Sequence, residues 1–354
     1  MRTYVPCVDE KKRFCGRVVK TRALKAVAIA LGCVLVLVGA GVGWAYWHFE
    51  HNIRSVDIDS ALGDDRPARP TPTAAPSASR DTAPVDTGVL NFLVLGSDSR
   101  TGAENKALGG GEDGGARSDT AMVVHLDAGR TEATVVSIPR DTLVERPSCP
   151  TESGGTTAVA YNVMFNSAYA VGGPVCAVKT VEHLTGVRMD HYLEIDFAGF
   201  AKLVDALGGV DVTTTEDIDD DLSHLHLEAG THHLDGEDAL AFARTRHGVG
   251  DGSDLGRIAL QQQLVKSLVG EVSADGLLTD PARLYRVADA ATGSLVADTG
   301  LDSLAELSDL ARSLRELSGD AVKTVVMPVV PAPADANRVV AKEPEAGKLW
   351  ESLR

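Results

Sequence analysis

Several motifs of common enzyme classes are missing from this sequence of 354 residues. There is no HExxH zinc motif, no C-x-x-C pair and no G-x-S-x-G nucleophile elbow, and the Gly-rich stretch at 109–115 lacks the Gly-Lys-Ser/Thr of a P-loop. These absences argue against a zincin-type protease, an α/β-hydrolase and an enzyme that uses a nucleotide.

Positive charge is scarce beyond the N-terminus. Residues 1–25 hold eight Lys and Arg against two acidic residues, which leaves −22 for the remainder of a chain whose net charge is −16. The strong negative charge of residues 26–354 disfavours nucleic-acid binding. The basic segment 1–25 is too short to form a helix-turn-helix domain. We therefore expect no nucleic-acid partner.

One segment has no charge at all. Residues 26–47 are 22 uncharged residues, about 33 Å as a helix at ~1.5 Å per residue, which is enough to cross a membrane. Because the basic tail 1–25 precedes it, the positive-inside rule puts the N-terminus in the cytoplasm, and Trp44, Tyr46 and Trp47 fit the outer aromatic belt. Signal peptides have shorter apolar cores. We expect an uncleaved single-pass anchor in the cell membrane, with the rest of the chain extracytoplasmic.

Residues 48–87 have little to bury. Five prolines stand there among Ala, Ser and Thr, which predicts an extended, mobile tether. Of the five cysteines, only Cys149 and Cys176 lie beyond the predicted span. In an oxidising compartment an isolated pair favours a disulfide over two free thiols.

After the tether, strand-like and helical patterns alternate. Apolar runs predict strands at 89–95, 190–196, 210–213 and 322–330, and helical patterns occur near 166–170 and at 173–185, 197–207, 255–272, 281–291 and 303–317. This alternation predicts an α/β domain over 88–330, a mixed central β-sheet flanked by helices in an α-β-α arrangement, preceded by one transmembrane helix. Residues 331–354 mix Pro, Ala and charge, and we expect a peripheral tail.

Two β-branched runs around a turn at 128–130 predict a hairpin with charged ends. If Asp127 faces Glu132, then Asp119 faces Arg140, because paired residue numbers in an antiparallel hairpin have a constant sum. Arg117 would lie beside them. A solvated cross-strand ion pair would explain the hairpin taken alone.

Two later segments favour an anionic ligand instead. Arg244 and Arg246 are two residues apart and share one face of an extended chain. Arg257 and Gln261 are four apart and share one face of a predicted helix. Guanidinium groups match phosphate oxygens with two hydrogen bonds each, so an acidic domain that still pairs its arginines favours phosphate as the ligand.

The sequence also resembles the LytR-CpsA-Psr family. The resemblance spans residues 89 to about 275 and follows that family's motifs in order. Its segments are NFLVLGSDSR (91–100), RSDT (117–120), SIPRDT (137–142), NSAYAVGG (166–173), DHYLEIDFAGFAKLVDALGGVD (190–211), LDGEDALAFARTR (234–246) and GRIALQQQ (256–263).

The resemblance implies a phosphotransferase outside the cytoplasmic membrane, whose partners are a polyprenyl-pyrophosphate-linked glycopolymer and peptidoglycan. It would move the glycopolymer with its linking phosphate onto peptidoglycan. By motif position, Asp98 and Asp119 would hold Mg²⁺ or Mn²⁺, which suits carboxylate and phosphate oxygens. The catalytic set would be Asp98, Asp119 and Arg140, and the pyrophosphate-binding set Arg117, Arg140, Arg244, Arg246, Arg257 and Gln261.

Two features qualify this interpretation. The family often has an Arg where this chain has Leu260, which removes one cationic contact. No general base is evident, because Asp98 and Asp119 would be bound to the metal, and a metal-bound carboxylate has a lowered pKa and accepts a proton poorly.

The polyprenyl chain needs an apolar tunnel, for which the candidates are Val181, Leu184, Phe197, Phe200, Leu203 and Leu207. Two alternatives remain open: a polyprenyl-pyrophosphate hydrolase, and a sensor of such lipids without catalysis.

Overall fold

The computed structural model describes residues 40–41, 43–69, 88–97, 105, 118–151, 154–246, 249, 254–273 and 280–354. The chain divides into two compact units, Met1–His51 and Asn52–Arg354. In the first, residues 43–51 are helical. Within the described ranges no helix is both long and apolar enough to cross a membrane. Most of the predicted span 26–47 lies outside these ranges.

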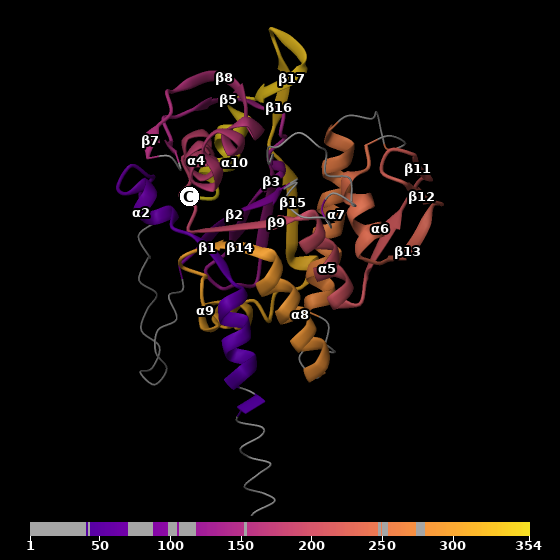
Figure 1. The fold of residues 1–354 in the computed structure, drawn as a ribbon. Coiled ribbons are helices and arrows are strands. Elements are labelled where there is room, and N and C mark those ends of the chain that lie inside the picture. Colours follow the sequence, from indigo (N-terminus) through magenta and orange to yellow (C-terminus); the bar gives the residue numbers. More distant parts are fainter. Residues whose placement is uncertain are drawn as a thin grey trace, which may run out of the picture. The chain divides into compact units, whose positions relative to one another are not determined.

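A mixed sheet of seven strands forms the centre of the second unit (Figure 1). Strand β2 is central, parallel to β9 and antiparallel to β3. The sheet order is β1 (Arg54–Val56), β14 (Leu295–Asp298), β9 (His191–Asp196), β2 (Leu90–Ser97), β3 (Ser118–Leu126), β4 (Ala133–Ser137) and β15 (Val322–Val326). The predicted mixed α/β domain is confirmed.

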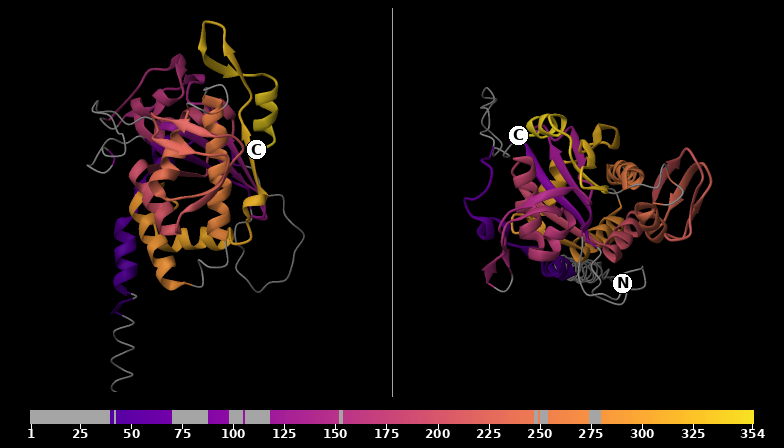
Figure 2. Two further views of the ribbon diagram at one scale, coloured as in Figure 1. Left: turned by 90° about the vertical axis from the view of Figure 1, so that its right-hand side faces the viewer. Right: turned by 90° about the horizontal axis from the view of Figure 1, so that it is seen from above.

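Helices cover both faces of this sheet (Figure 2). On one face, α2 (Ile58–Leu62), α4 (Asn166–Thr185) and α10 (Glu345–Glu351) share an apolar core with β2, β3 and β4. On the other face, α7 (Asp254–Ser273) and α9 (Leu304–Ser313) pack against the same strands. Beside α7 lie α5 (Phe197–Leu207) and α6 (Gly236–Arg244), and α8 (Pro281–Ser294) packs on α5.

Short strands outside the central sheet form two-stranded pairs. They are β5 (Leu143–Arg146), β6 (Pro150–Thr151), β7 (Gly155–Thr156), β8 (Ala160–Met164), β10 (Val210–Thr214), β11 (Ile218–Asp220), β12 (Leu225–Leu227), β13 (Gly230–Leu234), β16 (Val329–Ala332) and β17 (Asp335–Ala341), with a 3₁₀ turn η1 (Gly319–Ala321). The pairs are β5 with β8, β6 with β7, β10 with β13, β11 with β12, and β16 with β17.

The hairpin register agrees with the prediction. The residues of β3 and β4 pair from Leu126 with Ala133 to Met122 with Ser137, and these numbers have the sum expected from Asp127 facing Glu132. Helix α5 has the predicted bounds because Asp196 caps its N-terminus and Gly208, in the left-handed conformation, ends it. The two helical patterns at 166–185 form one helix, α4, kinked at Gly172 and Gly173.

The C-terminal segment 331–354 is not peripheral, which corrects the sequence prediction. Strand β17 pairs with β16, and the following helix α10 brings Trp350 into the main core, where its side chain is 2% exposed. Ala346 and Leu353 are buried beside it. The apolar residues of this segment, diluted among charges, complete the core face under α4.

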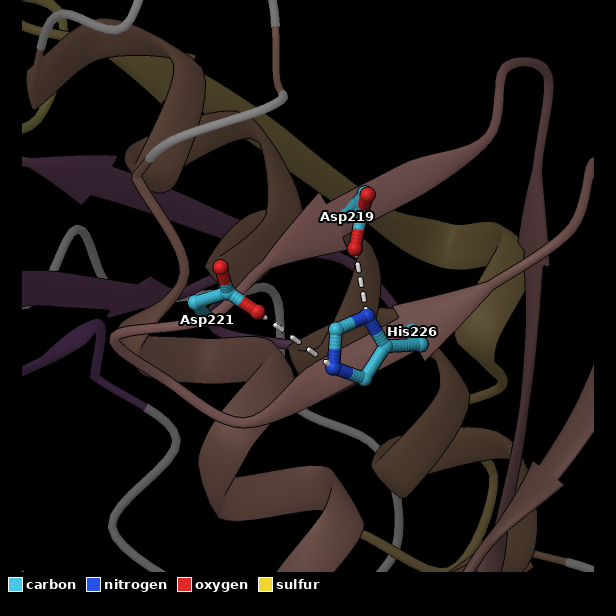
Figure 3. Close-up of side chains that lie close together, drawn as sticks. All are labelled: Asp219, Asp221 and His226. Carbon is cyan, nitrogen blue, oxygen red and sulfur yellow. Dashed lines mark hydrogen bonds and ion pairs between the residues drawn. The ribbon is translucent and has the colours of Figure 1, made fainter.

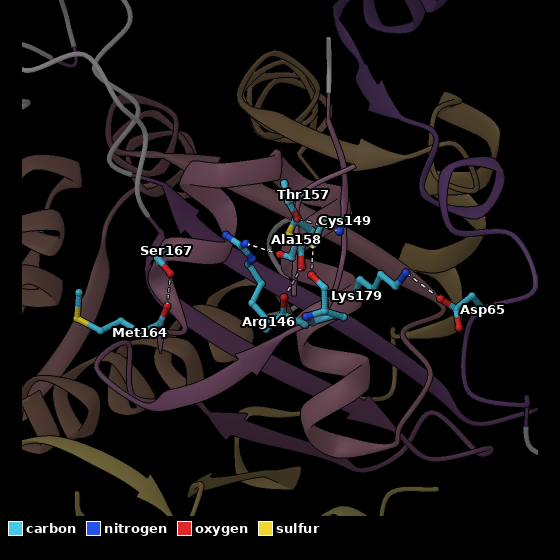
Figure 4. The surroundings of a disulfide bond; sticks show 11 residues. Asp65, Arg146, Cys149, Thr157, Ala158, Met164, Ser167 and Lys179 are labelled. Carbon is cyan, nitrogen blue, oxygen red and sulfur yellow. Dashed lines mark hydrogen bonds and ion pairs between the residues drawn. A yellow bond between two sulfur atoms is a disulfide. The ribbon is translucent and has the colours of Figure 1, made fainter. Parts of the chain in front are cut away.

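Cys149 and Cys176 form a disulfide, with an S–S distance of 2.05 Å (Figure 4). Both side chains are buried against Ala168. The backbone N–H of Cys149 donates to Thr157 Oγ1 at 3.1 Å. The disulfide thus ties the loop after β5 to helix α4.

Part of the predicted tether is also folded. Residues 54–56 form the edge strand β1, and 58–62 form α2. Arg66 follows, with a side chain 2% exposed that pairs with the equally buried Glu182 of α4 at 2.6 Å. Burial alone would lower the pKa of Arg66, but its hydrogen bond to Glu182 and the charge of that carboxylate raise the pKa. This pair anchors the segment before the Pro-rich part of the predicted tether on the domain, while 70–87 lie outside the described residues.

We predict that Arg66→Met lowers the free energy of unfolding by about 3 kcal/mol, because it leaves Glu182 charged and buried without its partner. Urea unfolding of the full-length chain measures this. The control is Arg69→Met, whose side chain is 61% exposed and 3.7 Å from Asp190. An exposed pair of this kind contributes roughly 0–1 kcal/mol. Equal effects of the two substitutions would contradict the anchoring role of Arg66.

Candidate functional site

A cavity of about 460 Å³ lies between the sheet and helices α5, α6 and α7. Its wall is apolar along most of its length and carries four arginines. The apolar lining is Val94, Met122, Ile195, Phe197, Phe200, Leu240, Leu264, Val265 and Leu268, and the arginines are Arg140, Arg244, Arg246 and Arg257. Arg140 comes from a segment about a hundred residues before the other three, and all four were predicted.

Arg140 reaches the cavity because the chain leaves the sheet just before it. The last backbone bond of the hairpin is from Ile138 N–H to Ala121 O at 2.9 Å. A turn follows, closed by Thr142 N–H and Pro139 O at 3.0 Å. Arg140 O then accepts from the N–H of Asn166 at the start of α4. Both ends of this turn are thus fixed by backbone hydrogen bonds.

Arg244 is the last residue of α6, and Arg246 lies just beyond it. Helix α6 begins at Gly236, where an added Cβ would lie 2.1 Å from Ala201 O, so only glycine permits this close approach to α5. Asp235 caps the helix by accepting from the N–H groups of its first turn. The Arg244 guanidinium stacks over the Phe197 ring, 4.7 Å from its centroid.

Asp254 gathers three of the arginines. Its carboxylate lies 2.5 Å from Arg257, 3.6 Å from Arg246 and 3.8 Å from Arg140. The Asp254 side chain is 17% exposed and that of Arg257 only 5%. Sequence reasoning missed this residue, although its position one helical turn before Arg257 was a usable signal. The arrangement holds several guanidinium groups in one place on the cavity wall.

Gln261 lines the cavity beside the arginines, and Leu260 precedes it on helix α7. The Nε2 of Gln261 donates to Thr120 Oγ1 at 3.0 Å and to Ala243 O at 2.9 Å. Both amide hydrogens therefore link α7 to β3 and α6, and none is left for a phosphate oxygen in this state. Leu260 is buried in an apolar cluster with Phe242. The position where the family often has an arginine is therefore part of the core in this chain.

Three further predicted residues belong to the segments at the ends of β2 and β3. Asp98 and Arg117 lie outside the described residues, and Asp119 is described only by its backbone in β3. There Gly96 pairs with Thr120 but Ser97 with Ser118, so Asp119 is the extra residue of a β-bulge. Bulges redirect the chain at functional sites. The neighbouring Gly96 and Thr120 both line the cavity.

The predicted tunnel residues divide between two faces of the sheet. Phe197 and Phe200 line the cavity. Val181 and Leu184 instead pack in the core beneath α4, on the opposite face, so their assignment to the tunnel was wrong. Leu203 and Leu207 are not among the lining residues. The apolar periodicity of a helix does not tell which core it faces.

Comparison with known proteins identifies relatives. A model of the LytR_cpsA_psr family matches residues 46–354. The chain is 35% identical over 278 residues to "Probable cell wall biosynthesis protein LcpB" of Corynebacterium glutamicum, a match that covers 77% of this chain and 63% of that protein. It is 33% identical to "Polyisoprenyl-teichoic acid--peptidoglycan teichoic acid transferase TagU" of Bacillus mycoides, over 66% of this chain and 67% of that protein.

A solved structure shares the fold. The crystal structure of Bacillus subtilis TagV superposes with a TM-score of 0.58 at 25% identity, covering 76% of this chain and 97% of that one. The chain spans less than two thirds of the length of LcpB, at 63%. The family model nevertheless covers the whole domain that carries the cavity and its arginines. The chain therefore belongs to the LytR-CpsA-Psr family.

Proposed function

We propose that this protein transfers a glycopolymer, together with its linking phosphate, from a polyprenyl-pyrophosphate carrier to peptidoglycan. The observation that carries the proposal is the composition of the cavity, whose lining combines four arginines with a larger set of apolar side chains. A polyprenyl-pyrophosphate-linked saccharide has the same two parts, a doubly charged pyrophosphate diester and a long hydrocarbon chain. The printed name of the TagU relative describes a transferase between a polyisoprenyl-linked polymer and peptidoglycan.

In this proposal the arginines stabilise charge on the transferring and leaving oxygens. Guanidinium groups are suited to this because each donates two hydrogen bonds in a fixed geometry. Phosphoryl transfer relies mainly on positioning and charge stabilisation, and the ion pairs of Arg140, Arg246 and Arg257 with Asp254 hold these side chains in place before the substrate binds. The acceptor would be a hydroxyl group of peptidoglycan, which attacks the phosphorus attached to the saccharide and expels polyprenyl phosphate.

Two further parts belong to the proposal. We propose Mg²⁺ at Asp98 and Asp119, where it would neutralise charge on the pyrophosphate; Mn²⁺ has similar ligand preferences. Support comes from the bulge at Asp119 and from the cavity-lining residues beside it. We also propose that residues 26–47 anchor the chain in the cell membrane with the domain outside, which would place the cavity near its lipid substrate.

The transfer reaction is tested with the full-length protein in detergent, Mg²⁺, a synthetic polyprenyl-pyrophosphate-linked saccharide and a peptidoglycan oligomer. Mass spectrometry should detect saccharide phosphate joined to peptidoglycan. Arg140→Ala should lower the rate about 100-fold, the typical cost of removing one charge-stabilising donor. The control is Arg312→Ala, a residue of α9 that is 74% exposed and pairs with Asp309.

The products distinguish the alternatives. Free saccharide phosphate with polyprenyl phosphate, and no conjugate, would make the protein a hydrolase. Tight lipid binding without any turnover would make it a sensor. Either result would contradict the proposed transfer.

A second prediction concerns the apolar part of the cavity. Leu268→Trp adds volume to a lining residue of α7 and should weaken binding of a polyprenyl pyrophosphate at least tenfold, while inorganic pyrophosphate binds as before. Leu284→Trp, on α8 and 41% exposed, is the matched control. Calorimetric titration measures both ligands. Unchanged lipid binding in the Leu268 variant would place the hydrocarbon chain elsewhere.

A third prediction concerns the metal. Chelation with EDTA should abolish transfer, and Asp119→Asn should raise the Mg²⁺ concentration for half-maximal rate at least tenfold, because one anionic ligand is lost. Measuring rate against Mg²⁺ concentration tests this, with Asp127→Asn at the distant hairpin turn as control. Full activity in EDTA would rule out the metal site.

A further inference from the structure

The hairpin formed by β11 and β12 presents two different faces. Along β11 and the residue that follows it, burial alternates: Ile218 and Asp220 are buried, whereas Asp219 and Asp221 are exposed. Asp220 is 2% exposed and is one of the residues that line the arginine-bearing cavity. An acidic group buried in the wall of an anion-binding cavity requires an explanation, because its charge repels the ligand.

The hydrogen bonds of Asp220 supply one. Its Oδ1 accepts from the backbone N–H of Leu222 at 3.0 Å and of Ser223 at 3.4 Å, which closes the hairpin turn. Its Oδ2 accepts from the backbone N–H of Arg246 at 3.0 Å. One carboxylate thus joins the hairpin to a segment 26 residues later.

Arg246 lies beyond the C-terminal end of helix α6, so its backbone is not held by the hydrogen bonds of that helix. Helix α6 ends at Arg244, and Thr245 is its cap, with its N–H on Ala241 O. The next N–H, that of Arg246, is the one that Asp220 accepts. A second link lies beside it, since Ser223 Oγ and Thr245 Oγ1 are hydrogen-bonded at 2.8 Å and Thr245 is fully buried.

We propose that Asp220 is a positioning residue that fixes the backbone at Arg246 and so holds this guanidinium at the pyrophosphate site. The inference rests on the proposed function for the identity of the ligand. The negative charge of Asp220 and its hydrogen bond to Arg246 predict opposite effects on anion binding when Asp220 is replaced. If the Asp220 charge mattered most, its removal would tighten anion binding; if its hydrogen bond to Arg246 matters most, removal weakens anion binding.

The outer face of the same hairpin supplies a matched control. Asp221 is one residue away, has the same charge and has a side chain that is 97% exposed. It faces His226, whose other ring nitrogen contacts Asp219 (Figure 3). Asp221→Asn therefore removes one negative charge from this hairpin without touching Arg246.

The test is calorimetric titration of the full-length protein in detergent with inorganic pyrophosphate and Mg²⁺. Asp220→Asn leaves an oxygen for the hairpin turn but sets an NH₂ group against the Arg246 N–H. We expect its affinity to fall about tenfold, the equivalent of one charge-assisted hydrogen bond at ~1.4 kcal/mol. Asp221→Asn should stay within about twofold. Tighter or unchanged binding by Asp220→Asn would overturn the inference.

A double-mutant cycle separates positioning through Arg246 from a general loss of structure. Arg246→Ala should weaken binding, and adding Asp220→Asn to it should weaken binding by no more than about twofold, because the positioned side chain is gone. Additive effects would refute positioning. If Arg246→Ala itself binds pyrophosphate normally, the proposed anion site fails instead, which is a separate result.

A gentler variant and a kinetic measurement complete the test. Thermal unfolding checks each variant. If Asp220→Asn does not fold, Ser223→Ala removes the hydrogen bonds of the Ser223 hydroxyl to Thr245 Oγ1 and to Asp220 O, leaves the Asp220 carboxylate in place, and should weaken binding about threefold. In the transfer assay, Asp220→Asn should raise KM for the lipid donor and leave KM for the peptidoglycan acceptor unchanged. Equal changes in both would contradict a role at Arg246.

Discussion

The site depends on holding several arginine side chains close together, and the rest of the domain provides the positions that make this possible. Guanidinium groups brought together without an anion repel one another, at a cost that rises as water is excluded. Asp254 offsets this repulsion by contacting Arg140, Arg246 and Arg257. An incoming pyrophosphate would meet side chains that are already gathered, so less conformational entropy is lost on binding.

The fold supplies the backbone positions from which these side chains reach the cavity. The site stands on one face of the sheet, where α5, α6 and α7 leave an apolar space. The opposite face is packed densely by α4 and α10, and carries the anchoring pair of Arg66 and Glu182. One face is thus packed by helices, whereas the other, although α7 and α9 pack on part of it, leaves a cavity beside α5, α6 and α7. This division explains how a cavity persists in a domain with several well-packed cores.

Much of this arrangement was predictable from the sequence. The hairpin register followed from its turn, and the bounds of α5 followed from a capping Asp and a terminating Gly. Arg140, Arg244, Arg246 and Arg257 share one cavity, as their motifs indicated, although Arg244 ends helix α6 and does not lie in the extended chain that its spacing from Arg246 suggested. Such features depend on local rules of periodicity, capping and turn geometry, which a single sequence displays.

The remainder depended on contacts between distant residues. Arg66 and Glu182 are 116 residues apart, and nothing local to either one indicates the pair that folds the start of the tether onto the domain. Trp350 fills a core built mostly from other segments, which is why its C-terminal segment looked peripheral. The sequence does not single out Asp220, because it stands among other aspartates and differs from Asp219 and Asp221 only in being buried in the folded protein.

One cavity is proposed to receive both parts of a polyprenyl pyrophosphate. Photo-crosslinking tests this, using a polyprenyl pyrophosphate with a diazirine on its hydrocarbon chain and peptide mapping by mass spectrometry. We expect labels on the cavity-lining residues of α5, α6 and α7, such as Phe200, Leu240 and Leu268, and competition by unlabelled lipid. Labels confined to the α4 face or to scattered surface residues would contradict it.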